Sequence, residues 1–167
     1  MRTVDEHVMG APPAICYQIA ADVENWPSIL AHYRWVRFRS REPDGAGRVE
    51  MAAWREFFPA HDRGTVARWP TRWVSDMRLA PSEPAVYFRH VEGITRGMDV
   101  KWEFFPVPGG TRVRIVHQWQ GPRWPLVGRL AADAVIGPAF VSAIARRTLA
   151  GVAAEAERRA CAGTGAS

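Results

Sequence analysis

Two histidines, His90 and His117, stand in alternating apolar and polar segments, at positions that strand periodicity turns toward the interior. An imidazole donates and accepts protons near neutral pH, so two of them in one cavity can serve as acid and base. The alternative is that each histidine is only a hydrogen-bonded core residue. The same predicted faces carry residues that an aliphatic core does not need, namely Trp73, Ser75, Met98, Trp102 and Trp119. We therefore expect a wet, aromatic-lined cavity suited to a flat or apolar ligand.

Four predicted strands position these side chains. Because successive side chains of a strand point to opposite faces, every second residue shares a face. The inward sets are Thr71, Trp73, Ser75 and Met77; Val86, Phe88 and His90; Met98, Val100, Trp102 and Phe104; and Val113, Ile115, His117 and Trp119. The intervening charged residues Asp99, Lys101 and Glu103 are expected to face water. Pro108-Gly109-Gly110 predicts a hairpin between the last two strands.

Other segments predict the frame around the cavity. Strands are expected at 3–9, 33–40 and 48–55, and short helical pieces at 15–20 and 22–30, after a proline pair that suits a helix start. Residues 57–68 are expected to form an irregular loop or a bulged edge. The following strand is expected to begin at Thr71, because Pro70 would break a ladder.

The C-terminal part changes period. From Leu126 the apolar residues recur about every 3.6 positions, which predicts a long helix, kinked or split at Gly137-Pro138. Together the elements predict an α+β fold, in which about seven antiparallel strands curve around this helix and leave an internal cavity. We expect one domain over residues 1–160 and a frayed tail over 161–167.

Charge and cysteine content exclude several classes of protein. The net charge is +5, and Lys101 is the only lysine among 22 basic residues. This charge suits an acidic partner, whereas an arginine-rich composition also arises in GC-rich genomes. The sequence has no dense basic run or zinc spacing typical of nucleic-acid binding, and its two distant cysteines predict neither disulfides nor a metal site. It has no apolar run long enough to span a membrane and no signal peptide, so we expect a cytoplasmic protein.

Several short motifs carry a resemblance to a known family. They are Trp26-Pro27 followed by Tyr33, the run Trp73-Val74-Ser75, the pair Met98 and Trp102, and the hairpin Gly109-Gly110-Thr111. With the order of elements, they make residues 1–160 resemble the START-like helix-grip superfamily (SRPBCC) of polyketide cyclases. Within it, the chain is similar to the single-domain aromatase/cyclase group of bacterial type II polyketide pathways.

The resemblance implies a reaction and a set of residues. Members of that group promote aldol ring closure and dehydration of a poly-β-ketone tethered to an acyl carrier protein, without a metal or redox cofactor. The matching pocket-lining positions are Trp26, Tyr33, Trp73, Ser75, Met98 and Trp102. Among them Tyr33 and Ser75 are expected to hydrogen-bond a ketone or enolate oxygen. The alternative is that Tyr33 only packs at a strand edge and Ser75 only fills a small space. Trp69, with Trp73 and Trp102, is expected to stack on the forming ring.

The chain departs from the group at three positions. Met77 stands where an arginine is usual, His90 where an interior arginine is usual, and His117 where a glutamine is usual. We therefore expect Met77 to contact substrate and the two histidines to take over the polar work. Asp133, in an apolar helical stripe, is expected either to orient a histidine or act itself, or simply to pair with an arginine.

Two alternatives remain open at this point. The first is a non-catalytic binding or transport protein for a lipid, a quinone or an aromatic polyketide. The second concerns five arginines, which either meet an acidic carrier protein and its phosphopantetheine or form an ordinary solvated face; they are Arg34, Arg37, Arg39, Arg146 and Arg147. The sequence also leaves a homodimer open.

Overall fold

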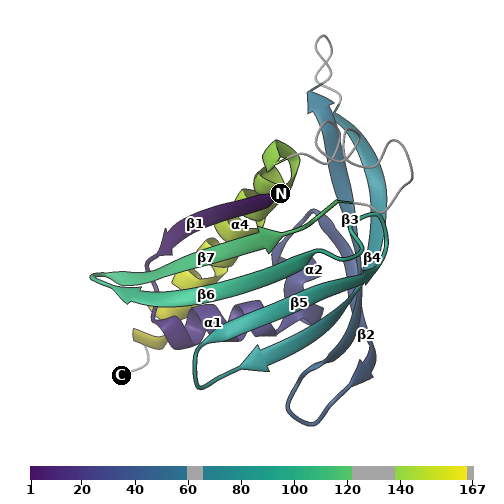
Figure 1. Ribbon diagram of the computed structural model, residues 1–167. Helices are drawn as coiled ribbons and strands as arrows, with labels where there is room; N and C mark the ends of the chain where they lie inside the picture. Colours follow the sequence, from purple (N-terminus) through teal and green to yellow (C-terminus); the bar gives the residue numbers. More distant parts are fainter. Residues whose placement is uncertain (60–65, 122–137, 165–167) are drawn as a thin grey trace.

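The computed structural model describes residues 1–59, 66–121 and 138–164, and within them the chain forms one antiparallel sheet of seven strands. The strands are β1 (Arg2–Met9), β2 (Tyr33–Arg41), β3 (Gly47–Pro59), β4 (Val66–Ala80), β5 (Ala85–Glu92), β6 (Asp99–Val107) and β7 (Gly110–Gln118). Their spatial order is β1-β7-β6-β5-β4-β3-β2. The sheet curves around the long helix α4 (Pro138–Thr164), as Figure 1 shows. The predicted helix-grip fold is confirmed.

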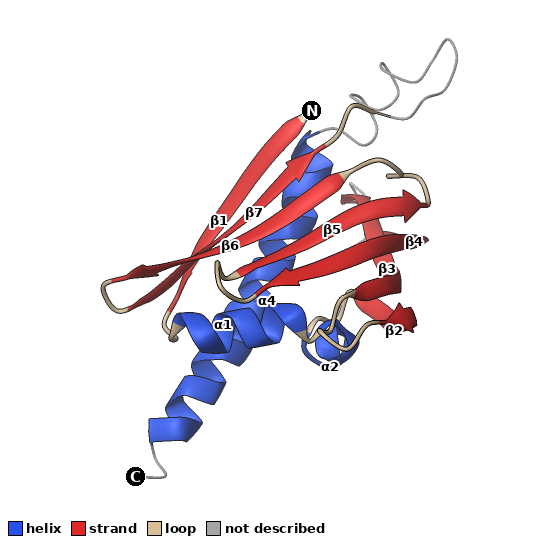
Figure 2. Cartoon of the chain, turned by 60° about the horizontal axis from the view of Figure 1, so that its bottom comes forward, coloured by secondary structure: helices blue, strands red, loops and turns tan. Residues whose placement is uncertain are grey.

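Two short helices complete the layer that covers the concave side of the sheet. α1 (Pro13–Ala21) starts at the proline pair, because Pro12 holds an extended conformation and Pro13 fills the first helical turn. A 3-10 turn (Val23–Asn25) then leads into α2 (Trp26–Ile29). Figure 2 shows these helices on the same side of the sheet as α4. The core therefore lies between one helical layer and the inner sheet face.

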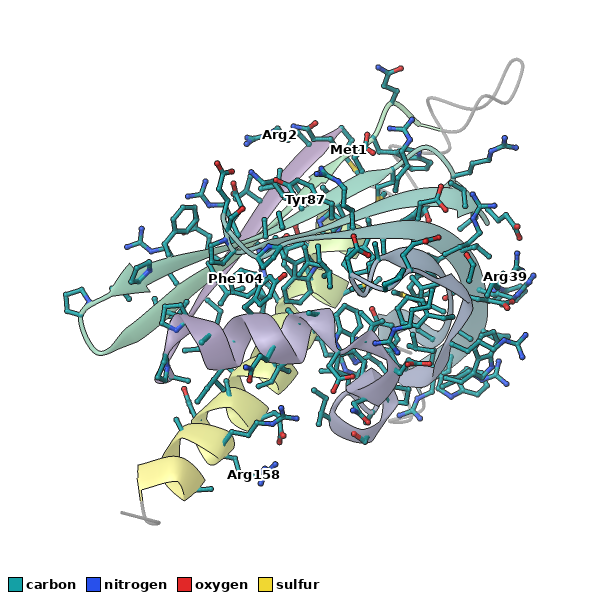
Figure 3. The ribbon with its side chains drawn as sticks, turned by 90° about the horizontal axis from the view of Figure 1, so that it is seen from below. Met1, Arg2, Arg39, Tyr87, Phe104 and Arg158 are labelled. Carbon is teal, nitrogen blue, oxygen red and sulfur yellow. The ribbon has the colours of Figure 1, made fainter. Side chains whose placement is uncertain are left out.

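The inner face follows the predicted strand phase. Val100, Trp102 and Phe104 of β6 are buried, while their neighbours Lys101 and Glu103 are partly exposed on the other face. The Phe104 ring meets the ring of Tyr17 in α1 edge-on, with centroids 5.7 Å apart. Phe104 is labelled in Figure 3. This phase is what directs the aromatic residues of β4 to β7 toward the helices.

β1 lies at one edge of the sheet beside β7, although they are the first and the last strand of the described chain. The register runs from Arg2 opposite Gln118 to Met9 opposite Thr111. The Met1 amino group also donates a hydrogen bond to the Trp119 carbonyl at 2.7 Å. This pairing places Thr3 directly opposite His117.

The hairpin of β3 and β4 is longer than the sequence predicted. β4 begins at Val66 rather than Thr71, and Pro70 lies within it, opposite Trp54. The Trp54 N–H donates to the His32 carbonyl at 2.8 Å, so Trp54 turns its main-chain polar groups away from β4. In an antiparallel pair the residue opposite, Pro70, then also turns its main-chain polar groups away from β3. On that other side β5 pairs with β4 only from Val74 on, so no strand there needs an N–H from residue 70. The proline therefore interrupts no ladder hydrogen bond. The register also shifts between Glu56 and Pro59, at the start of the segment predicted to be an irregular loop or a bulged edge.

The described part of the C-terminal helix is α4. It runs from Pro138, where the sequence predicted a kink or a break, and the rest of the predicted helix, residues 126–137, lies outside the described residues. α4 continues to Thr164, four residues into the predicted frayed tail.

A buried carboxylate ties β2, β3 and β4 together on the outer sheet face. The Glu50 side chain is only 2% exposed, and it accepts hydrogen bonds from Arg37, Arg39 and Arg72. Arg39 also bonds Glu92, and Figure 3 shows it at the rim of the sheet. Burial raises the pKa of Glu50, but the three guanidinium groups outweigh that effect and hold its pKa at about 2.

We expect Glu50→Gln to lower the free energy of unfolding by about 1–3 kcal/mol at pH 7, because the arginines lose their shared anion. A depressed carboxyl pKa stabilises the folded state above the ordinary value of 4.5, and that stabilisation is lost as pH falls toward 2. The difference between wild type and variant in urea titrations should therefore shrink between pH 5 and pH 2. Glu92→Gln, at a half-exposed partner of Arg39, is the control. A difference independent of pH would contradict this role of Glu50.

Candidate active site

A cavity of about 70 Å³ lies between the inner sheet face and α4. Strands β2 to β7 form one wall, and Trp26 of α2 and three residues of α4 complete it. The lining residues are Trp26, Tyr33, Met51, Trp73, Phe88, His90, Val100, Trp102, Ile115, His117, Ile144, Ala145 and Thr148. Most of this surface is aromatic or aliphatic, with a few polar groups, which is the usual composition of a small-molecule site.

Trp26 is the centre of the aromatic lining. Its ring centroid lies 5.2 Å from that of Tyr33, 5.6 Å from that of Trp102 and 6.0 Å from that of Phe88. The indole N–H donates to the Ile19 carbonyl at 3.0 Å, which fixes the ring orientation. The cavity therefore presents rigid aromatic faces on which a flat ligand can stack.

Two histidines reach the cavity from strands separated by β6. His117 Nδ1 lies 3.3 Å from the Thr3 hydroxyl, and His90 Nδ1 lies 2.6 Å from the Thr95 hydroxyl. The His90 ring also stacks on Trp73, with centroids 6.0 Å apart. A threonine hydroxyl either donates or accepts, so these partners allow each imidazole to take either tautomer. The arrangement therefore suits groups that pass a proton in either direction.

A third histidine–threonine pair was not found by sequence reasoning. His32, between α2 and β2, is buried, and its Nε2 lies 3.1 Å from the hydroxyl of Thr148 on α4. Nothing in the sequence links Thr148 to a histidine 116 positions away. The packing of α4 beside α2 is what brings the two together.

Several residues predicted from the sequence do not line the cavity. Ser75, Met77 and Met98 face inward and are buried, but they belong to the packed core around it. Met77 is opposite Phe88 of β5 and fills the usual arginine position with apolar volume. The Ser75 hydroxyl has no hydrogen-bond partner among the described residues.

Trp69, which was expected to stack on the forming ring, does not line the cavity and is 65% exposed. It lies near the start of β4, where the strand extends beyond its pairing with β5 and no sheet neighbour on that side encloses it. Asp133 lies outside the described residues. Among the residues that are described, no group of three potential ligands is arranged to hold a metal ion. No helix in this part of the chain is long and apolar enough to cross a membrane.

The fold and the aromatic cavity define a helix-grip domain with an internal cavity. The sequence profile of the family described as "Polyketide cyclase / dehydrase and lipid transport" matches residues 9–138. The chain therefore belongs to this family. It is also 30% identical over 113 residues to a protein of Streptomyces halstedii named "Putative polyketide cyclase", covering 67% of this chain and 94% of that one.

Solved structures show the same fold. The Zhui aromatase/cyclase of Streptomyces sp. R1128 matches with a TM-score of 0.72 at 20% identity, over 95% of this chain and 94% of that one. The protein TTHA0849 of Thermus thermophilus also matches with a TM-score of 0.72, at 21% identity, over 98% of this chain and 99% of that one. At these identities the likeness concerns the fold alone.

Proposed function

We propose that this protein is an aromatase/cyclase that closes and dehydrates a ring of a carrier-protein-bound poly-β-ketone. The observation that carries the proposal is the convergence of His90 and His117 on one cavity with aromatic walls. Membership of the polyketide cyclase family and the name of the Streptomyces halstedii relative support it. The test is whether the protein produces ring-closed, dehydrated products that do not form without it.

In the proposed reaction His117 acts as the main acid/base group. It removes an acidic proton from a carbon between two ketones, and that carbon then attacks a third carbonyl carbon of the same chain. The new alkoxide takes up a proton, with Tyr33 as a hydrogen-bond donor to the reacting oxygen. In the second step an imidazolium protonates the hydroxyl, which leaves as water while a neighbouring carbon loses a proton. No electrons enter or leave the substrate.

His90 is proposed to assist as the second acid/base group, while Trp26, Trp73 and Trp102 hold the folded chain. The cavity of about 70 Å³ is smaller than the roughly 300–1,000 Å³ typical of bound small molecules. A poly-β-ketone long enough to form several rings would therefore have to displace lining side chains as it enters.

A non-catalytic binding protein for a lipid, a quinone or a finished aromatic polyketide is the second candidate. The family description also includes lipid transport, and most cavity-lining side chains are aromatic or aliphatic. This candidate predicts saturable binding without turnover. A titration followed by product analysis of the same sample separates the two functions.

If an acidic carrier protein delivers the substrate, raising the salt concentration should lower kcat/KM for the carrier-bound substrate and leave that for a free thioester mimic unchanged. Arg147→Glu, on the exposed side of α4, should weaken this dependence. Arg146→Glu would have a second effect, because the Arg146 Nε lies 3.2 Å from Oδ1 of the buried Asp5 and a glutamate there would repel that carboxylate. Equal salt responses of the two substrates would mean that these arginines are an ordinary solvated face.

A further inference from the structure

The pair His32 and Thr148 brings an aliphatic hydroxyl to the cavity, that of Thr148, which the proposed reaction does not use. His32 is only 4% exposed, and its carbonyl accepts the Trp54 N–H, which anchors it to β3. Its ring lies beside that of Tyr33, with centroids 4.8 Å apart. The imidazole is thus held in place by the backbone, by a ring contact and by the Thr148 hydroxyl at 3.1 Å.

Thr148 reaches the cavity from the helical wall. It follows Ile144 by one turn of α4, and both residues line the cavity together with Ala145. Among the described lining residues, it alone has an aliphatic hydroxyl. His90 and His117 belong to the sheet, which is the opposite wall of the cavity. A ligand between the sheet and α4 therefore meets polar groups from both walls.

The pair can form a hydrogen bond with an uncharged oxygen atom of a ligand, either as donor or as acceptor. When His32 Nε2 carries the proton and donates it to the Thr148 oxygen, the threonine O–H can donate to a ketone. When Nε2 accepts the Thr148 O–H instead, the threonine oxygen can accept from a ligand hydroxyl. The same pair therefore recognises a ketone before aromatisation and a phenol after it.

We propose that Thr148 binds a ketone or phenol oxygen of the ligand and determines specificity for oxygenated rings, and that His32 positions its hydroxyl. This inference rests on the proposed function for the choice of ligand class. It does not require turnover, so binding alone can test it.

The experiment compares phenol with toluene, which have nearly the same shape and differ in a hydroxyl against a methyl group. Their dissociation constants are measured by NMR titration of the full-length protein. Wild type should bind phenol more tightly than toluene. Thr148→Val keeps the branched shape without the hydroxyl, so it should weaken phenol binding by about 3–10-fold, as expected for one neutral hydrogen bond, and leave toluene binding unchanged.

Two further variants separate positioning from packing. Thr148→Ser keeps the hydroxyl and should retain the preference for phenol. His32→Phe keeps a ring without nitrogen and should reduce the preference, whereas His32→Gln, whose amide nitrogen can take the place of Nε2, should restore part of it.

Three results would overturn the inference: no binding of either probe to wild type, equal affinities of wild type for both, or equal loss of both probes in Thr148→Val. Preserved probe selectivity in a protein that never forms cyclised product would instead refute only the proposed function.

Discussion

Replacing His117 by alanine is expected to slow ring closure by about 10²–10⁴-fold, the usual cost of losing a positioned general acid/base. The protein should still fold and bind its ligand, because the His117 ring lines a cavity and its described hydroxyl partner, Thr3, lies at the sheet edge. Single-turnover rates with a thioester mimic measure this directly. KM should change much less than kcat.

His90→Ala tests whether the second imidazole shares the work. If the two histidines act together, the double variant should be about as slow as the slower single variant, since residues that act as a unit are not additive. His7→Ala, at an exposed histidine of β1, is the matched control and should keep full activity. Full activity of the double variant would return both histidines to a structural role.

Trp26→Ala is expected to lower the free energy of unfolding by about 3–5 kcal/mol, the range for a large buried ring. The side chain is 2% exposed, contacts three other rings and donates a hydrogen bond to Ile19. The alanine variant loses this packing and leaves the Ile19 carbonyl without its indole donor. Denaturant titrations of wild type and variant give the difference.

Trp69→Ala is the matched control for this measurement, because the same residue type is removed from an exposed position. It should change the unfolding free energy by less than about 0.5 kcal/mol. Similar losses in the two variants would mean that Trp26 is not the centre of the aromatic core.

Sequence periodicity was sufficient for the strands that carry the site. Alternation in β6 and β7 predicted that Trp102 and His117 share the inner face, because a one-residue error would expose a whole apolar set. It did not distinguish inward residues that reach a cavity from those that fill the core. Met77 and Met98 share the face of the cavity residues, but neighbouring side chains enclose them on every side.

Features that depend on distant partners were beyond the sequence. The tolerance of Pro70 within β4 depends on where β5 stops pairing, and the pairing of Thr3 with His117 depends on β1 lying beside β7. The burial of His32 against Thr148 likewise follows from helix packing. In each case the residue types were visible in the sequence, but the neighbour that gives them meaning was not.

The proposed function requires that this cavity converts a carrier-bound poly-β-ketone into a ring-closed, dehydrated product. The most direct measurement is mass-spectrometric product analysis after the substrate is formed on its carrier protein, with wild type, with His117→Ala, or with no added protein. We predict that wild type yields one dominant product that has lost water, while the variant resembles the reaction without protein. The same mixture of spontaneously cyclised products in all three samples, despite binding of the substrate, would contradict the claim and favour a binding protein.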